Sequence, residues 1–408
     1  MTETDKPHRA ALIRNRPFAA LWLARSTSYF GDFITLTALT LLLYERSASP
    51  LYLGAALAAR ALPQALGPIA GAVADRFDPR RVMIVCDLLR MVTIAVIAVA
   101  LPPAPVLIPL IAVTAVLSTF FLPASKSMVP RLVPRASLGP ANAALGVSHN
   151  VAFAAGPVLG AVLFQAFGPT AVFALDAATY LISALLLVAL PARAARRTGE
   201  RGTGRVFAGL SGLGGEAREG VRYIWRHRVV RIVAIGLFLS VAFSAMDNVA
   251  LVFRLRDDLG QPASALGLTL SVFGVAMIAA PLLLLSALRS FSGLRLLTIG
   301  LLCSGIGTAA TGLVDALPAV LVAYAIAGAG NGFENIAVDT TIGEHVEEEW
   351  LGRVFGTVYG PIFLADALAS LGAATLLELV SPGTVFVIAG AGVIAIGLVV
   401  WFAGVRYT

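Results

Sequence analysis

Apolar stretches of membrane-spanning length recur throughout this 408-residue chain. A helix needs about 20 residues, at about 1.5 Å each, to cross roughly 30 Å of hydrocarbon. Hydrophobic residues make up 58% of the chain and charged residues 13%, whereas soluble domains are nearer about 45–50% and about 25%. We predict an all-α membrane protein with twelve transmembrane helices, at residues 17–44, 51–74, 82–101, 105–125, 140–166, 169–191, 230–253, 264–288, 295–313, 317–339, 352–377 and 382–404.

The basic residues are unevenly distributed among the loops between these stretches. A net charge of +7 would suggest nucleic acid in a soluble protein. Of the 30 Lys and Arg residues, however, 24 fall in the N-terminus, the even-numbered loops and the C-terminus. The other six lie in the opposite loops (Arg46, Arg254, Arg256) or inside predicted helices (Arg25, Arg60, Arg90). Because Lys and Arg collect on the cytoplasmic side, we predict that both termini are cytoplasmic and that nucleic acid is not a partner.

An apolar helix end beginning at Leu66 runs directly into Asp-Arg-Phe-Asp-Pro-Arg-Arg, which ends at Arg81. This segment resembles the loop between helices 2 and 3 of major facilitator superfamily transporters, whose pattern is Gly-x-Leu-Ala-Asp-Arg-x-Gly-Arg-Arg. The resemblance implies a conformational gate in which Asp75 packs against the start of helix 11, near Arg353. The matching residues are Gly71, Asp75, Arg76, Arg80 and Arg81, while Val73 replaces the Leu and Asp78 the second Gly.

A second motif lies in the fifth predicted helix. Gly156, Pro157 and Gly160 match the Gly-x-x-x-Gly-Pro-x-x-Gly-Gly motif of antiporter members, with Ala152 and Ala161 replacing the outer glycines. Small residues with a Pro let helices approach closely and bend. The start of helix 1 (NRPFAALW) and the end of helix 4 (FFLPASKSMVPRLVP) resemble the drug:proton antiporter branch that contains macrolide efflux proteins and the enterobactin exporter. Helix 4 lacks the Arg that many proton antiporters carry there.

The chain also matches itself at an offset of 213 residues, most clearly at Gly, Pro and Arg positions that punctuate helices. Examples are Gly54 with Gly267, Pro68 with Pro281, and Arg76 with Arg289. We predict two six-helix halves, residues 1–191 and 230–408, with a binding site between them near the midplane. Residues 192–229 form a cytoplasmic linker whose EAREGVRYIWRHRVV segment predicts an amphipathic helix on the membrane surface. A solvated linker is the alternative for its Gly-rich part.

Ionisable residues inside membrane spans are costly to bury and are candidates for function. We predict a proton and substrate cavity formed by Asp32, Asp247, Glu334, Asn331 and Asn335. A structural hydrogen bond is the alternative for Asp32, as are hydrogen bonds between helices for the two Asn residues. We expect structural roles for the remaining polar or reactive residues of the spans: the local pair Asp87 and Arg90, and Asp176, His149, Asn150, Cys86 and Cys303.

Arg60 on helix 2 and Asp366 on helix 11 lie at similar predicted depths. Helices 2 and 11 face each other across the two halves in the superfamily that the chain resembles. We therefore predict that Arg60 and Asp366 form a cross-seam pair. The alternatives are that Arg60 pairs with Asp32, or that Asp366 is neutral and hydrogen-bonded.

The resemblance implies a proton-driven exporter that moves a hydrophobic or amphipathic small molecule by alternating access. We expect a monomer in a bacterial-type inner membrane, powered by the proton gradient without a cofactor or metal. We do not expect an enzyme, because no nucleophile–base pair or metal-ligand cluster stands out. The alternatives are a siderophore, lysophospholipid or other metabolite transporter of the same fold, including a symporter, and a sensor without proton-linked flux.

Overall fold

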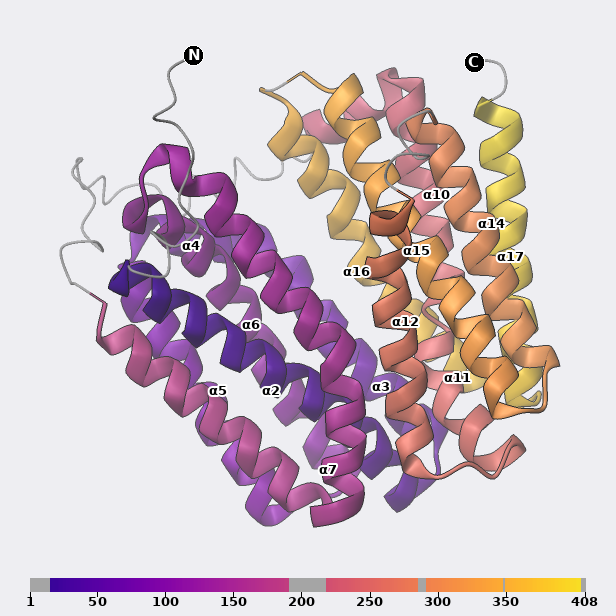
Figure 1. Ribbon diagram of the computed structural model, residues 1–408, viewed down its shortest axis with the longest axis horizontal. Helices are drawn as coiled ribbons and strands as arrows, with labels where there is room; N and C mark the ends of the chain where they lie inside the picture. The colour runs from indigo at the N-terminus through magenta and orange to yellow at the C-terminus, as the bar shows by residue number, and fades with distance from the viewer. Residues whose placement is uncertain (1–14, 191–217, 285–290, 348, 405–408) are drawn as a thin grey trace. The chain divides into compact units, whose positions relative to one another are not determined.

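The computed structural model describes residues 15–190, 218–284, 291–347 and 349–404. All regular secondary structure within these ranges is helical (Figure 1). In the first part of the chain the helices are α2 (Arg16–Ser47), α3 (Pro50–Ala61), η1 (Leu62–Leu66), α4 (Gly67–Arg76), α5 (Pro79–Ala100), α6 (Ala104–Leu132), η2 (Arg135–Ser137) and α7 (Leu138–Val188).

A helix over 218–226 opens the second part of the chain. It is followed by α10 (Arg228–Ser244), α11 (Asp247–Phe253), the π-helix η3 (Arg254–Asp258), α12 (Ala263–Leu283), α14 (Gly293–Leu313), α15 (Leu317–His345), α16 (Leu351–Leu376) and α17 (Pro382–Gly404). The Gly-rich part of the predicted linker lies outside the described residues. The helix predicted after it is present.

Eight helical segments of the described ranges are long and apolar enough to cross a membrane. This confirms the prediction of an all-helical membrane protein. One of the eight covers 54 residues, Arg135–Val188, and is long enough for two crossings at about 1.5 Å per residue. It is kinked at Gly168, whose φ of 77° is left-handed, directly before Pro169. The predicted spans 140–166 and 169–191 fall on the two arms of this kink.

The predicted span 51–74 is interrupted in the structure. It covers α3, the 3₁₀ turn η1 and α4, so no uninterrupted α-helix runs through it. Pro63 lies in the 3₁₀ turn, and Pro68 lies in the first turn of α4. Proline lacks a backbone N–H and clashes with the preceding turn of a helix, which accounts for the break.

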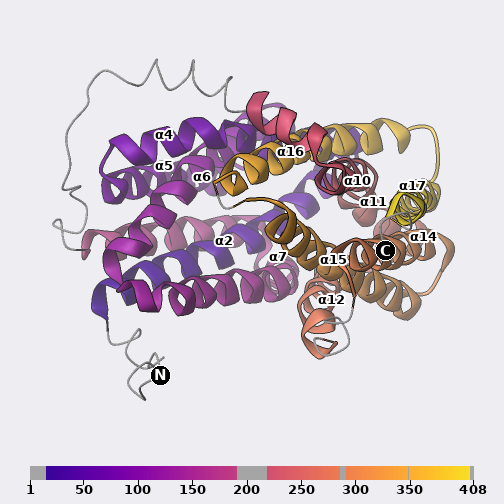
Figure 2. The ribbon, with the colours of Figure 1, turned by 90° about the horizontal axis from the view of Figure 1, so that it is seen from above.

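The chain divides into two compact units, residues 1–38 with 66–210 and residues 39–65 with 211–408. In the first unit α5 packs against both α6 and α7, and α4 packs against α6. In the second unit α14 packs against α15 and α17, and α12 packs against α15 (Figure 2). In the same unit α16 packs against α3. The C-terminal part of α2 and all of α3 thus cluster with the second unit.

The acidic-basic turn after α4 is built from caps. Asp78, which replaces a family glycine, accepts a hydrogen bond from the backbone N–H of Arg80 at 3.0 Å and caps α5, with Pro79 in its first turn. The Arg80 side chain donates to the carbonyl oxygens of Leu187 and Val188, at 3.0 and 2.5 Å. These carbonyls lie at the end of α7, where helix carbonyls lack the usual partner one turn later, and that of Leu187 also accepts from the Leu190 N–H at 3.2 Å. Arg80 therefore fastens the end of α7 to the start of α5.

Close packing of α7 on α2 depends on the glycines of the antiporter-type motif. A Cβ added at Gly156 would lie 2.5 Å from the Phe33 Cβ, and one at Gly160 would lie 2.5 Å from the Ile34 carbonyl oxygen. Any larger residue would push the two helices apart. The close approach predicted from these small residues is therefore present.

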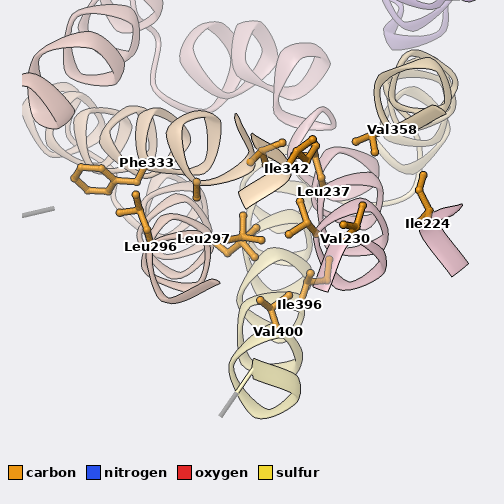
Figure 3. Packing of buried hydrophobic residues seen from close by; sticks show 14 of the residues in the cluster. Ile224, Val230, Leu237, Leu296, Leu297, Phe333, Ile342, Val358, Ile396 and Val400 are labelled. Atoms are coloured by element: carbon orange, nitrogen blue, oxygen red, sulfur yellow. The ribbon is translucent and has the colours of Figure 1, made fainter. Parts of the chain in front are cut away.

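A large apolar cluster in the second unit joins α10, α14, α15, α16 and α17 (Figure 3). The helix over 218–226 is attached to it through Ile224, which is 7% exposed, whereas Val221 and Trp225 are exposed. Gly220 of this helix packs against Arg353 and Thr357 of α16. One face of the predicted amphipathic helix thus packs against the rest of the protein, and another face is exposed.

Candidate functional site

The most concentrated set of buried charges in the described chain lies in the first unit, where α2, α5 and α7 meet. Arg90 of α5 donates from Nη2 to both carboxylate oxygens of Asp32 on α2, at 3.1 and 3.2 Å. The same nitrogen donates to the Tyr180 hydroxyl of α7 at 3.2 Å, and that hydroxyl donates to Asp32. A charged donor and a phenol therefore hold one carboxylate, which fixes its position within the helices.

Asp87 forms the second half of this cluster. It lies one helical turn before Arg90 and pairs with Arg90 Nη1 at 3.3 Å. It also accepts a hydrogen bond from the Ser183 hydroxyl at 2.6 Å. The Tyr180 ring lies 4.2 Å from the Arg90 guanidinium carbon, which adds a cation–π contact. The predicted local pair Asp87–Arg90 is present, but Arg90 also reaches Asp32 on another helix.

Asp176 of α7 is the third carboxyl of the cluster and is fully buried. Thr179 donates to its Oδ1 at 3.2 Å, while Oδ2 has no hydrogen-bond partner among the described residues. It lies within electrostatic range of both Asp32 and Arg90. Gly31 gives it room, because a Cβ at Gly31 would lie 2.1 Å from Asp176 Oδ1.

These residues give an unequal charge count around one guanidinium. Asp32, Asp87 and Asp176 would carry three negative charges if all were ionised, against the single positive charge of Arg90. Excess charge is expensive inside a membrane protein and is relieved by proton binding. Asp32 has a side chain that is 26% exposed, whereas that of Asp87 is 0% exposed and Asp176 is likewise fully buried. The cluster can bind protons, and Asp32 is its carboxyl with access to solvent.

A group of aromatic side chains on α2 and α7 includes His149, on which the charge of Asp32 acts. The His149 ring packs edge-to-face against Tyr29 and Phe33, with centroids 4.8 and 5.5 Å apart. Phe33 also packs edge-to-face on Phe153 at 5.3 Å. These rings are at least partly exposed, and partly exposed rings offer flat apolar surface with polar edges.

In the second unit Glu334 of α15 is buried, with 3% of its surface exposed. Ser240 of α10 donates to its Oε2 at 3.4 Å, and Oε1 has no partner among the described residues. Gly300 of α14 makes this position possible, because a Cβ there would lie 2.9 Å from the Glu334 side chain. A buried carboxyl with hydroxyl partners can hold a proton without a counter-charge.

Asn331 and Asn335 lie on a different face of α15. Asn335 donates to the Asn331 carbonyl oxygen at 3.2 Å, and its amide also contacts the Met277 sulfur of α12 at 4.0 Å. Asn335 is exposed, whereas Glu334 faces α10. The structure brings the two Asn residues together but separates them from Glu334, with which the sequence grouped them.

Asp247 lies at the start of α11, directly after the break that separates it from α10. The Tyr324 hydroxyl of α15 donates to it at 3.5 Å, and the charge of Asp366 on α16 acts on it. The Arg60 guanidinium of α3 is in turn within electrostatic range of Asp366. Arg60, Asp366 and Asp247 thus share one region of the second unit.

The remaining gate residues lie at helix ends. Gly71 and Asp75 are in the last three turns of α4, which ends at Arg76. Arg81 pairs with Asp78 at 3.7 Å and is exposed. Arg353 in the first turn of α16 pairs with Glu219 at 3.5 Å and packs over Trp350. A role of these residues in gating stays a prediction.

A polar contact at the end of α2 joins residues far apart in the sequence. The Tyr44 hydroxyl donates to Asp257 in the π-helix, and the two residues are 213 positions apart. Arg256 lies over the Tyr44 ring at 5.6 Å. Within the same π-helix, the buried Arg254 pairs with Asp258 and Asp315, each at 2.9 Å.

The family model of the Major Facilitator Superfamily matches residues 21–256 and 233–407. The chain belongs to the Major Facilitator Superfamily. This confirms the resemblance seen in the sequence, and it makes the protein a multi-pass membrane transporter and not an enzyme.

Several superfamily members resemble the chain along almost its whole length. The MFS-type transporter YfiS of Bacillus subtilis is 27% identical over 403 residues, covering 95% of this chain and 93% of YfiS. The multidrug efflux pump Tap of Mycobacterium tuberculosis is 26% identical, with 90% and 89% covered. Macrolide efflux protein A of Streptococcus pyogenes is 22% identical, with 94% of both chains covered.

Solved transporters share the fold at low identity. The crystal structure of the nucleoside transporter NupG has a TM-score of 0.78 at 14% identity, with 96% of this chain and 99% of that chain covered. A transporter of the POT family has a TM-score of 0.75 at 15% identity, with 96% and 97% covered. At these identities the likeness shows the superfamily fold alone.

The sequence predicts Asp32 as a cavity residue and Asp87 with Arg90 as a local pair, but not the cluster that joins them. The prediction left out Tyr180 and Ser183, which bind the two carboxylates. The missing Arg in helix 4 was a signal, since Arg90 on α5 provides a buried positive charge next to Asp32. Tyr180 and Ser183 follow Asp176 at positions 4 and 7, one face of a helix, so this polar face of α7 could have been read from the sequence.

Proposed function

We propose that this transporter is a proton-driven exporter of a hydrophobic or amphipathic small molecule, working by alternating access. The main observation that supports this proposal is the cluster of three carboxyls around the single Arg90 guanidinium. Such a cluster gains stability by taking up protons, and Asp32 connects it to solvent. The efflux functions named for Tap and macrolide efflux protein A support an outward direction.

In this mechanism Asp32 is the residue that couples proton and substrate. When Asp32 is ionised, Arg90 and Tyr180 hold its carboxylate. When it binds a proton, the attraction to Arg90 is lost, and the guanidinium retains its ion pair with Asp87. The exchange changes how α2 is held against α5 and α7, which is the kind of two-state element that alternating access requires.

The aromatic side chains next to Asp32 suggest the substrate class. Tyr29, Phe33, His149 and Phe153 offer ring faces and edges to a flat apolar molecule. A partly exposed carboxylate beside them favours a molecule that carries a positive charge or is neutral.

We propose that Glu334 and Asp247 serve as further proton-binding carboxyls of the second unit.

The twelve-span topology belongs to the same proposal. The two arms of α7 each cross the membrane, and α3 with η1 and α4 forms one interrupted crossing, as do α10 with α11. Both termini face the cytoplasm, as the distribution of basic residues favours. In this arrangement the turn after α4 is a cytoplasmic gate, and Asp75 is its latch.

Transport by purified protein in liposomes tests the function. Wild type with an imposed pH gradient should accumulate a cationic hydrophobic dye, and collapsing the gradient should release it. Asp32→Asn mimics the protonated carboxyl, so it should abolish proton-driven accumulation while sparing exchange between labelled and unlabelled dye. Glu378→Gln removes an exposed carboxylate and is the matched control.

The outcomes separate the alternatives. An Asp32→Asn variant that accumulates dye as well as wild type would show that Asp32 is not the coupling residue. Movement of the dye in the same direction as the protons would indicate a symporter. If the protein transports a lipid or a chelator but no dye, the proposed substrate class is wrong, although the fold is unchanged.

A further inference from the structure

An apolar groove of about 370 Å³ runs between α10 and α17 on the outer surface of the second unit. Exposed apolar side chains such as Ile235, Leu239 and Val399 form its edges. Small residues form its floor, namely Gly236, Gly392, Ala395 and Ala403. Figure 3 shows α10 and α17 side by side, with Leu237, Ile396 and Val400 between them.

The groove has the length of one membrane leaflet. It extends along α10 from Arg231 to Phe243, which is about 18 Å at about 1.5 Å per residue. One leaflet contributes half of a hydrocarbon core of roughly 30 Å. The volume of the groove is also in the range of about 300–1,000 Å³ that small-molecule sites occupy. An extended hydrocarbon chain matches this shape better than a compact molecule does.

One end of the groove is positively charged. Among the residues that the structure describes, Arg231 is the only charged one that lines it. Within the described residues its guanidinium makes one hydrogen bond, from Nη1 to the Trp225 carbonyl at 3.0 Å, and lies 5.5 Å from the Trp225 ring. The other N–H groups are available to a ligand. An exposed Trp beside an Arg is typical of the membrane–water interface, where lipid head groups lie.

We propose that the groove binds an anionic phospholipid, with one acyl chain between α10 and α17 and the phosphate on Arg231. The basic residues that precede Arg231 favour a negative head group, because clusters of Lys and Arg beside a membrane helix attract anionic lipids. They are Arg218, Arg222, Arg226 and Arg228. The site is on the lipid-facing surface and is separate from the carboxyl cluster of the first unit.

Such a lipid would bind both sides of the junction between α10 and the helix over 218–226. Arg231 belongs to α10, and its partner Trp225 belongs to the preceding helix. Ile224 beside Trp225 is buried in the core of the second unit. A phosphate on Arg231 therefore fixes the orientation of a helix that lies directly after the long linker.

Native mass spectrometry of the purified full-length protein can test the site. The probes are phosphatidylglycerol and phosphatidylcholine with identical acyl chains, added to protein in neutral detergent. Wild type should retain one phosphatidylglycerol in preference to phosphatidylcholine. Arg231→Gln should lower this preference about fivefold, the effect of one surface cation on an anionic lipid, while Arg231→Lys should preserve most of it.

Two matched pairs of variants locate the binding. Ala395→Phe fills the groove from an exposed position and should abolish retention of both lipids, whereas Leu398→Phe on another exposed face of α17 should not. Arg222→Gln removes a nearby exposed charge outside the groove and should lower the preference much less than Arg231→Gln does. Equal loss in Arg222→Gln and Arg231→Gln would overturn the site in favour of diffuse surface attraction. Full retention by Ala395→Phe would likewise exclude an acyl chain in the groove.

Discussion

Arg90 and Asp32 form an ion pair between α5 and α2, at 3.1 Å, although 58 residues separate them in the sequence. Arg90 is also the counter-charge of Asp87, so two carboxylates share one guanidinium. Its own side chain is 2% exposed, and no other cation of the first unit is paired with either carboxylate in the described structure. The stability of the unit and its proposed proton binding therefore depend on the same residue.

Arg90→Gln should destabilise the protein strongly, because it leaves Asp87 buried without its counter-charge. Removing one partner of a buried ion pair costs about 3–5 kcal/mol. Thermal unfolding of the purified protein in detergent measures the loss. The double variant Arg90→Gln with Asp87→Asn should recover part of it, since the orphaned charge is gone. A double variant no more stable than Arg90→Gln alone would contradict this account.

Gly31→Ala should also be destabilising, for a steric reason. The added Cβ would lie 2.1 Å from Asp176 Oδ1 and 2.3 Å from the Thr179 hydroxyl. Overpacking of this kind costs about 1–3 kcal/mol. Gly146→Ala in α7 is the control, because nothing lies within 4 Å of its Cβ position. Alanine is favoured over glycine in a helix by about 0.5–1 kcal/mol, so Gly146→Ala should unfold at the same temperature as wild type or slightly above it.

Exchange of charge tests the proposed pair of Arg60 and Asp366. Arg60→Asp and Asp366→Arg should each impair export, because each places two like charges in one region of the second unit. The double swap restores opposite charges and should regain part of the transport rate. Losses that simply add in the double variant would eliminate a direct interaction.

Labelling of single cysteines tests the proposed orientation. Cys86 and Cys303 are the two cysteines of the chain, both free thiols, and are first replaced by Ala. Arg205→Cys in the linker should then react with a membrane-impermeant maleimide only after the cells are opened. Labelling in intact cells would reverse the topology and with it the cytoplasmic position of the turn after α4.

The latch role of Asp75 is measurable as a change in distance. Asp75→Asn removes the negative charge that the resemblance assigns to holding the cytoplasmic side closed. Spin labels on the cytoplasmic ends of the helices should then report a shift toward longer distances. An unchanged distance distribution would leave Asp75 without this role.

Local chemistry allowed much of the fold to be predicted from the sequence. Runs of apolar residues gave the helices, and Asp78 with Pro79 marks the start of α5. The break at η1 was also signalled, by Pro63 and Pro68, but the apolar pattern continues through it and the prediction followed that pattern. The π-helix at Arg254–Asp258 could not be predicted, since it forms around the bonds of Arg254 to Asp315 and to the end of α14.

The candidate site was predictable in its members and not in its pairings. Burial cost alone singles out Asp32 and Glu334. The partner of each carboxyl depends on how the helices pack. The packing depends on glycines such as Gly31 and Gly300, because a side chain there would collide with a carboxyl-bearing residue of the neighbouring helix. Spacing in the sequence identifies neighbours on the same helix, as for Asp87 and Arg90. It does not identify a partner on a different helix.

The hydrogen bond between Tyr44 and Asp257 is relevant to the origin of the internal repeat that the sequence predicts. Their separation of 213 residues is also the offset of the internal repeat predicted from the sequence. In a symmetric pair, a residue can touch its own counterpart only at the two-fold axis. An ancestor assembled from two identical copies would have placed one side chain against itself at this point, where two ionised aspartates would repel each other. Once two copies are joined in one chain, each position can change alone, and a tyrosine facing an aspartate is a contact that identical copies could not make on their axis.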